Sequence, residues 1–428
     1  MDSAAVSHVP PGSIPCAPRS AGRPGAAPYT PPMTTDSEAP VTRQRLAQRV
    51  MAVPPSGIRR FFDVIATMPD VISLGVGEPD FDSPPQVVEA GIRALRAQRT
   101  HYTSNFGMIE LRRALSAHLE RLYGVTYDPA TELLMTVGAS EAVGVAIGAV
   151  VDPGDEVLLH EPSYVAYVPG IIFAGGTPVS IPTGPENGWQ LEPAAVEAAI
   201  TPRTKVLFLG YPCNPTGAVL SPETVRALAE IADRHDLIVI SDEIYDRLVY
   251  GGHRHEAFSA LPGMRDRTIL LGGFSKAYAM TGWRIGYVAA PRELLDGVVK
   301  IHQYQIMSAP TIAQDAALEA LASAEPDVAR MVAEYDRRRR MFVDGLNRIG
   351  LPTAEPQGAF YAFPRISGTG LTSDQFAERL LFEHEVAAVP GSAFGPSGEG
   401  YLRCSLATSF EKLEEALVRI ERFVRALG

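Results

Sequence analysis

The 428-residue sequence contains little lysine, few cysteines and no long uncharged apolar run. Its three cysteines, Cys16, Cys213 and Cys404, are far apart, which excludes a disulfide framework and favours a reducing, cytoplasmic setting. No apolar stretch approaches the roughly 20 residues that a membrane-spanning helix needs, so we expect no membrane partner. The net charge is −11 and no Lys- or Arg-rich arm is present, which argues against a nucleic-acid partner.

The scarcity of lysine makes each remaining lysine informative. Only four of the 38 Lys and Arg residues are lysines, namely those at positions 205, 276, 300 and 412. A guanidinium stays protonated and cannot form an imine, whereas an ε-amine desolvated in a pocket can do so. Lys276 lies in a glycine-rich stretch, Gly272–Tyr287, that follows the apolar run Thr268–Leu271. Scarcity alone leaves open the alternative that Lys276 is a surface lysine in a glycine-rich loop.

The apolar pattern predicts an α/β fold. With 46% hydrophobic residues the chain can bury a large core, and its length favours two domains or lobes. The runs that we expect to be strands are Leu133–Val137, Glu156–His160, Lys205–Leu209, Leu237–Ser241 and Thr268–Leu271. The stretches with helical periodicity are Leu111–Leu122, closed by Gly124, then Glu223–His235 and Glu411–Leu427. Alternating strands and helices indicate a parallel sheet covered on both faces, whose ligands bind outside the carboxyl ends of the strands.

The first 41 residues differ from the rest of the chain. The first forty contain nine prolines, many Ala, Ser and Gly residues, and no periodic apolar pattern. Such a segment cannot bury enough surface to offset its ordering entropy, so residues 1–41 are predicted to be a disordered extension. They lack the basic start and apolar core of a signal peptide, and Met33 is a candidate start of translation.

Polar residues follow several of the expected strands. After Leu133–Val137 comes Gly138-Ala139-Ser140-Glu141, a glycine turn that opens a helix and can cradle an anion. Ser140 as a plain helix cap is the alternative interpretation. Asp242 ends the strand Leu237–Ser241, where a carboxylate needs a cation or donors, although it can also cap the next turn. Asn214 lies in the turn Gly210–Gly217, and Tyr164 lies just past a strand end, where it is either core or a stacking residue.

Two other clusters carry less weight. His253 and His255 flank Arg254, but no third ligand has suitable spacing, so we predict no metal site. The run Arg337–Arg340 is interpreted as a solvated helix face, with anion binding as a distant alternative.

The block Ser275-Lys276 followed by Thr281–Gly286 resembles the lysine signature of class I/II, or fold-type I, pyridoxal-phosphate-dependent aminotransferases. The family's lysine holds the cofactor as a Schiff base, and an arginine eight positions later, here Arg284, grips its phosphate. The resemblance extends from about Val53 to the end of the chain. The segments that point to bacterial enzymes for N-acetyl-LL-diaminopimelate, aspartate or aromatic amino acids are Lys300–Tyr304, Ser308–Thr311 and Val389–Gly395.

This resemblance implies a fold and a domain division. The fold is expected to have a large domain with a mostly parallel seven-stranded sheet and a smaller α/β domain. Residues 76–305 would form the large cofactor-binding domain. Residues 42–75 and 306–428 would supply the N-terminal segment and the C-terminal part of the small domain.

The resemblance also assigns roles to the candidate residues. Lys276 would carry pyridoxal 5'-phosphate and act as the catalytic base. The residues that would contact the phosphate are Ala139, Ser140, Ser275, Arg284 and, from the neighbouring subunit of a homodimer, Tyr102. The residues that would contact the ring are Asp242 at the pyridine nitrogen, Asn214 and Tyr245 at the phenolic oxygen, and Tyr164 by stacking. The position three before the lysine, a phosphate-binding serine in some branches, is Gly273 here.

Substrate binding is implied at three positions. Gly77 would contact the substrate through its backbone, Asn214 through its side chain, and Arg403 through a bidentate grip on the α-carboxylate. The partners would be an L-amino acid and a 2-oxo acid such as 2-oxoglutarate. No counterpart is found for the arginine that selects dicarboxylates in animal aspartate aminotransferases. Two alternatives remain: a cysteine-conjugate β-lyase with the same site chemistry, and a transcription regulator, for which no helix-turn-helix is found.

Overall fold

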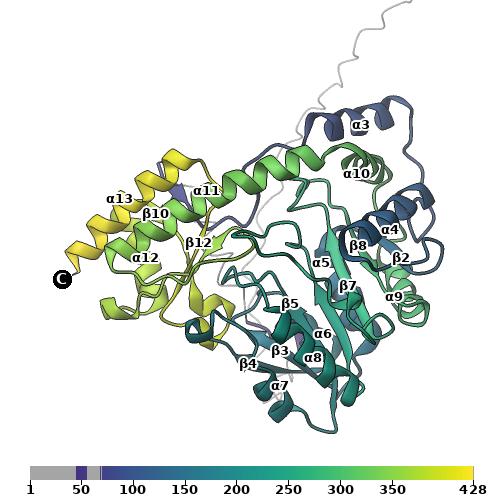
Figure 1. Ribbon diagram of the computed structural model, residues 1–428, viewed down its shortest axis with the longest axis horizontal. Helices are drawn as coiled ribbons and strands as arrows, with labels where there is room; N and C mark the ends of the chain where they lie inside the picture. Colours follow the sequence, from purple (N-terminus) through teal and green to yellow (C-terminus); the bar gives the residue numbers. More distant parts are fainter. Residues whose placement is uncertain (1–44, 55–67, 69, 428) are drawn as a thin grey trace, which may run out of the picture. The chain divides into compact units, whose positions relative to one another are not determined.

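A seven-stranded, mostly parallel sheet lies at the centre of the computed structural model, which describes residues 45–54, 68 and 70–427 (Figure 1). The strands lie in the order β2-β8-β7-β6-β5-β3-β4, and only β8 runs against its neighbours. Their bounds are β2 Leu133–Thr136, β3 Glu156–Glu161, β4 Thr177–Pro182, β5 Thr204–Gly210, β6 Ile238–Asp242, β7 Thr268–Gly273 and β8 Gly286–Ala289. The predicted parallel sheet is therefore confirmed.

The strands bury side chains on both faces of the sheet. In β5, Val206 and Phe208 join one core, whereas Leu207 and Leu209 join another, as the two-residue period of a strand requires. The helices that cover the first face are α5 Gly138–Val150, α6 Tyr167–Ala174 and α9 Arg292–Gln305. The helices that cover the second face are α7 Pro193–Ala199 and α8 Pro222–Arg234, together with α3 Pro85–Arg96, α4 Ile109–Tyr123 and α10 Thr311–Ser323, which pack where β2, β8 and β7 lie.

The predicted helices are found close to their expected bounds. Helix α4 ends at Gly124, whose φ of 71° lies in the left-handed region that favours glycine at a helix end. Helix α8 begins after Ser221, whose side chain accepts a hydrogen bond from the Thr224 amide, and α13 spans Phe410–Ala426. The five expected strands are also confirmed, but reading the apolar runs missed β4 and β8.

The C-terminal part of the chain forms a second apolar core. Helix α11 leads from α10 towards α12 and α13, which flank short strands (Figure 1). The additional bounds are α1 Gln48–Met51, α11 Glu325–Ile349, α12 Ser373–His384, β1 Ile72–Ser73, β9 Tyr361–Ala362, β10 Val386–Ala387, β11 Val389–Pro390 and β12 Leu402–Ser405. Strands β11, β12 and β9 form an antiparallel sheet, and β1 pairs in parallel with β10. This part therefore combines the segment of strand β1 with the C-terminal part of the chain.

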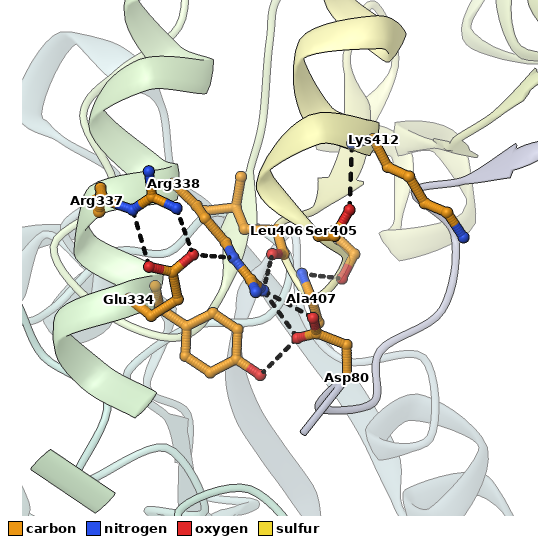
Figure 2. A network of polar contacts seen from close by, with 10 residues as sticks. Asp80, Glu334, Arg337, Arg338, Ser405, Leu406, Ala407 and Lys412 are labelled. Atoms are coloured by element: carbon orange, nitrogen blue, oxygen red, sulfur yellow. Dashed lines mark hydrogen bonds and ion pairs between the residues drawn. The ribbon is translucent and has the colours of Figure 1, made fainter. Parts of the chain in front are cut away.

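The arginine run on α11 corrects the prediction of a solvated face. Arg338 and Arg339 are 5% and 3% exposed, whereas the side chains of Arg337 and Arg340 are 52% and 62% exposed. Four consecutive residues span a full turn of helix, so they cannot all face solvent when the helix packs on its neighbours. The buried guanidiniums have carboxylate partners, Arg338 with Asp80 and Glu334 (Figure 2), and Arg339 with Asp336 and Glu355.

Some predictions fall outside the described residues. The disordered extension 1–41 and the candidate start Met33 lie there, as does part of the segment 42–75. The domain boundaries stay predictions, since the chain from Leu46 onward forms one compact unit. Within the described ranges, none of the helices combines the length and the apolar character that a membrane crossing requires.

Candidate active site

A cavity of about 400 Å³ lies outside the carboxyl ends of the parallel strands, where sheets of this kind bind ligands. Its walls contain the predicted site residues Gly77, Ala139, Ser140, Tyr164, Asn214, Asp242, Tyr245, Ser275, Lys276, Arg284 and Arg403. Tyr102 is the exception, because it does not line this cavity and its side chain is 82% exposed. Residues that are as much as 326 positions apart thus meet in one place.

Lys276 follows strand β7, and its side chain enters the cavity. Its Nζ atom donates a hydrogen bond to the carbonyl of Gly77 at 2.5 Å. Burial, followed by the positive charges of Arg403 and Arg284, lowers the pKa of Lys276 to about 8. A substantial share of the amine is therefore neutral close to physiological pH, as a nucleophile or a base requires.

Asp242 lies at the end of strand β6, buried beneath the cavity. Its Oδ2 accepts a hydrogen bond from Tyr167 Oη at 2.8 Å, and its Oδ1 accepts one from the Ile244 amide at 3.2 Å. Burial raises the pKa of Asp242 to about 6, although both hydrogen bonds act in the opposite direction. Gly210 makes room for this pair, because a Cβ there would lie 2.7 Å from Tyr167 Oη. Two hydrogen bonds thus hold the Asp242 carboxylate in place, and it forms no ion pair with a described residue.

The start of helix α5 has the features of an anion cradle. Ala139 and Ser140 lie in the first turn of this helix, whose free amide groups carry partial positive charge. Arg284 packs beside them, and a Cβ on Gly138 would lie 2.5 Å from its Nη2 atom. The backbone of Arg284 has a φ of 53°, an uncommon left-handed conformation for a residue with a side chain. Gly286 completes the close approach, because a Cβ there would lie 2.7 Å from the Ala139 nitrogen.

Close packing explains why position 273 is a glycine and not a serine. Gly273 pairs with Gly286 across strands β7 and β8, and a Cβ on it would lie 3.2 Å from the Gly286 Cα. A serine there would require its neighbours to move by a few tenths of an ångström. Ser275 lines the cavity instead and is 7% exposed.

Arg403 lies on strand β12 at the other end of the cavity and is 3% exposed. Its Nη1 donates to Asn214 Oδ1 at 3.2 Å, and its Nη2 donates to the Gly75 carbonyl at 2.5 Å. Neither partner is charged, and Nε is buried without a hydrogen-bond acceptor among the described residues. A buried guanidinium without a counterion provides a site for a carboxylate.

Tyrosines define the wall between Lys276 and Arg403. Tyr245 Oη and Tyr361 Oη are 2.8 Å apart and share a hydrogen bond. Gly77 fits against this wall, because a Cβ there would lie 2.6 Å from Tyr361 Oη. Tyr164 also lines the cavity. Its ring is 5.5 Å from that of Tyr167, in an edge-to-face arrangement.

Sequence reasoning missed Tyr167 and Tyr361. Tyr167 begins helix α6 and Tyr361 begins strand β9, so both read as ordinary core aromatics. The sequence signal for these tyrosines lies in the residues that they contact. Gly210 and Gly77 are glycines because the tyrosine hydroxyls approach where a Cβ would lie. His255, for which the sequence analysis predicts no role as a metal ligand, does not line the cavity. Its Nε2 is 2.6 Å from Glu243 Oε2.

The cavity therefore combines a helix start suited to an anion, an amine of lowered pKa, a buried carboxylate and a buried guanidinium that forms no ion pair with a described residue. Comparison with known proteins identifies the family of the chain. Residues 69–420 match the family described as aminotransferase class I and II. The chain is 52% identical over 379 residues to the putative aminotransferase YugH of Bacillus subtilis, covering 89% of this chain and 98% of that protein. It is 46% identical over 382 residues to an aspartate aminotransferase of Pyrococcus abyssi, with the same coverage of both chains.

A solved structure extends this likeness to the fold. The aromatic aminotransferase from Pyrococcus horikoshii OT3 superposes with a TM-score of 0.83 at 46% identity, covering 86% of this chain and 100% of that one. The fold-type I architecture of the family is thereby shown for this chain. The chain belongs to the class I and II aminotransferases and is an enzyme of that family.

Proposed function

We propose that this enzyme uses pyridoxal 5'-phosphate to exchange the amino group of an L-amino acid with a 2-oxo acid, 2-oxoglutarate being one acceptor. The observation that carries the proposal is the meeting of Lys276, Asp242 and the α5 anion cradle around one cavity. An amine, a buried carboxylate and an anion site are the groups that a phosphorylated pyridine aldehyde would require. Gly138 and Gly286 allow Arg284 and strand β8 to approach the start of α5 closely, which supports the fit of a phosphate group there.

The residues that would hold the cofactor act on different parts of it. Lys276 Nζ would carry it covalently, and the amides of Ala139 and Ser140 would bind its phosphate together with Ser275 and Arg284. Bound in this way, pyridoxal phosphate supplies an electron sink for the Cα–H bond of an amino acid.

The ring of the cofactor would have its own partners. Asp242 would face the pyridine nitrogen and keep it protonated, and this cation is the partner that the buried carboxylate lacks. Asn214 and Tyr245 would donate to the phenolic oxygen, and Tyr164 would stack on the ring. Tyr167, which holds Asp242 at 2.8 Å, would keep the carboxylate in position.

Substrate binding and proton transfer would use the other end of the cavity. Arg403 would bind the α-carboxylate, with Asn214 and the Gly77 backbone beside it. Lys276, once released, would move the proton from the substrate Cα as a general base, which its lowered pKa favours. The relatives are named as aminotransferases, so the β-lyase alternative is not favoured.

We further propose that the working unit is a cytoplasmic homodimer. Tyr102 is 82% exposed outside its own chain's cavity, as expected of a residue that reaches the phosphate of a second subunit. Other exposed apolar side chains follow helix α9 or end it, at Tyr304, Ile306 and Met307. Asn105, three residues from Tyr102, donates to the Met307 carbonyl at 2.8 Å, so the two groups lie on neighbouring segments. The two buried free cysteines, Cys213 and Cys404, are consistent with a reducing compartment.

Borohydride reduction tests the cofactor assignment. Purified protein incubated with pyridoxal phosphate should absorb as a bound imine, and peptide mapping after reduction should find the adduct on Lys276. Lys276→Ala should abolish the adduct, whereas Lys205→Ala, at a lysine paired with Asp152 and Asp155, should leave it unchanged. An adduct on another lysine would refute the proposal. A panel of amino acids with 2-oxoglutarate then identifies the donor, and acceptor-independent release of pyruvate would point to a lyase.

Subunit mixing tests the shared site. Lys276→Ala is mixed with a Tyr102→Ala/Arg284→Ala double variant under conditions that exchange subunits. One site of the mixed dimer keeps its lysine and regains Tyr102 from the partner, so partial activity should return. A lack of recovery despite demonstrated exchange, or a fully active monomer, would count against the shared site.

A further inference from the structure

Arg338, in the middle of helix α11, makes contacts that extend well beyond its own helix. Its Nη1 donates to both carboxylate oxygens of Asp80, at 2.8 and 2.9 Å, and to the Leu406 carbonyl at 3.4 Å. Its Nε donates to Glu334 Oε1 at 2.9 Å, one turn back on the helix. Figure 2 shows the guanidinium between Asp80, Leu406 and Glu334. One buried side chain thus joins three separate parts of the chain.

The two distant segments that Arg338 contacts are the ones that flank the substrate end of the cavity. Asp80 lies three residues after Gly77, whose carbonyl accepts from Lys276. Leu406 lies three residues after Arg403, whose guanidinium donates to the Gly75 carbonyl. The segments touch again where the Ser405 amide donates to the Leu74 carbonyl at 2.7 Å.

The Gly75–Asp80 segment depends on side-chain contacts for its shape, among them those of the Thr281 hydroxyl with Glu78 and of the Tyr335 hydroxyl with Asp80. It contains neither helix nor strand between β1 and α3, yet two of its carbonyls accept hydrogen bonds from cationic side chains. A backbone without secondary structure keeps its position only through such external contacts. The Asp80 carboxylate, bound by Arg338 through both oxygens, is therefore a further anchor of the segment, at a residue that does not line the cavity.

Stability alone does not account for a charge at position 338. The side chain of Arg338 is 7% exposed, and well-packed apolar residues are often as stabilising as a buried ion pair. The rings of Phe81 and Tyr335 already lie 5.2 and 5.6 Å from the guanidinium carbon, so an apolar side chain would find apolar neighbours. What an apolar residue cannot do is fix Asp80 and the Leu406 carbonyl at hydrogen-bond distance from one point.

We propose that Arg338 is a positioning residue, which through Asp80 and Leu406 fixes the Gly75–Asp80 segment relative to Arg403 and thereby sets the affinity for the substrate carboxylate. This inference rests on the proposed function for the role of Arg403. Arg338 does not itself contact the residues of the anion cradle; Arg284 is linked to the segment through Thr281, which contacts Glu78. Cofactor retention should therefore depend on Arg338 much less than substrate affinity does.

Steady-state kinetics of the holoenzyme test the proposal with the Arg338→Met and Asp80→Asn variants. Each should raise the KM for the amino donor about tenfold, because small misplacements of binding groups cost up to roughly 10² in efficiency. The kcat should fall less than about threefold, and the dissociation constant of pyridoxal phosphate should stay within about twofold. The matched control is Arg337→Gln, the neighbouring arginine, which is half exposed and shares only Glu334; its KM should not change.

A second variant separates positioning from stability. The Asp80→Leu/Arg338→Met double variant replaces the ion pair with apolar residues, so its melting temperature should match or exceed that of the wild type. Its KM should nevertheless be raised as in the single variants. A folded double variant with wild-type KM would overturn the proposal, as would an equal KM change in Arg337→Gln.

Amide hydrogen exchange of the cofactor-free protein provides a readout that does not depend on turnover. Exchange across residues 75–80 should be faster in Arg338→Met and Asp80→Asn, while helix α5 stays as protected as in the wild type. Unchanged exchange in the segment would overturn the positioning role. If the wild type transferred no amino group and yet this segment was loosened, the proposed function would fail while the positioning of the segment stood.

Discussion

Replacing Asp242 by asparagine should stabilise the cofactor-free protein while it removes activity. In the wild type, the pKa of this buried carboxyl is raised from 3.8 to about 6, so the folded protein ionises it at a cost. An asparagine has nearly the same shape, and the existing partners can serve it. Its Oδ1 can accept from the Ile244 amide, and its Nδ2 can donate to Tyr167 Oη, a hydroxyl that accepts as well as donates.

The size of the effect follows from the pKa shift. A shift of about two units at 1.36 kcal/mol each corresponds to roughly 3 kcal/mol. Because the folded pKa of this acid is raised, the penalty grows as pH rises from about 4 to about 6, and it is constant above that. The hydrogen bonds from Tyr167 and Ile244 already enter this net shift. We therefore expect Asp242→Asn to raise the free energy of unfolding by about 3 kcal/mol at pH 8 and by about half as much at pH 5.

Denaturant unfolding of both cofactor-free proteins, at one protein concentration and at pH 5 and pH 8, measures this difference. Asp266→Asn, at a carboxylate whose side chain is 91% exposed, controls for the loss of a charge and should change nothing. The cofactor-loaded Asp242→Asn enzyme should retain some cofactor and lose about 10²–10³ in turnover, as typical for one tuned electrostatic contact. A variant no more stable than the wild type at pH 8, or a gain equal at both pH values, would refute the reasoning.

Three further outcomes are expected. Tyr167→Phe removes a donor to the ionised form of Asp242, so the pKa of this carboxyl in the cofactor-free protein should rise further, by about 1–2 units; an NMR titration that finds no rise would contradict this. Gly138→Ala places a Cβ 2.5 Å from Arg284 Nη2 at a φ of 72°, so pyridoxal phosphate should bind at least about tenfold more weakly while the sheet stays folded, as equilibrium dialysis and circular dichroism can check. Lys276 in the cofactor-free protein should react with amine reagents with a midpoint near pH 8, where an unperturbed lysine would react near 10.5; a midpoint near 10.5 would contradict its burial beside cations.

The parallel sheet was predictable because its inner strands are buried on both faces and therefore read as continuous apolar runs. Strand β4 escaped notice because it is an edge strand, largely accessible to solvent, with two prolines in six residues. Strand β8 is only four residues long and begins with Gly286, which reads as the end of the preceding glycine-rich block. The prediction of a solvated face for the arginine run on α11 was wrong, because residue type alone does not distinguish the exposed Arg337 and Arg340 from the buried, ion-paired Arg338 and Arg339.

The candidate site was predictable where a motif fixes a residue at a strand end, as it does for Lys276 and Asp242. Tyr167 was missed because its role depends on a contact with Asp242, 75 residues away in sequence. The network around Arg338 was missed for the same reason, since Asp80 is 258 residues distant. Such partners are set by tertiary packing, and the local pattern contains no trace of them.

The reversed direction of strand β8 has a consequence for how the site is assembled during synthesis. Since β7 and β8 are antiparallel neighbours, Lys276 and Arg284 emerge at the same edge of the sheet from one short connection. These two groups, both proposed to bind the cofactor, are thus synthesised within nine residues of each other. The contact between Arg403 and the Gly75 carbonyl can form only later in synthesis, because the two residues are separated by 328 positions. The residues proposed to bind the cofactor are therefore all synthesised before Arg403, the residue proposed to bind the substrate carboxylate.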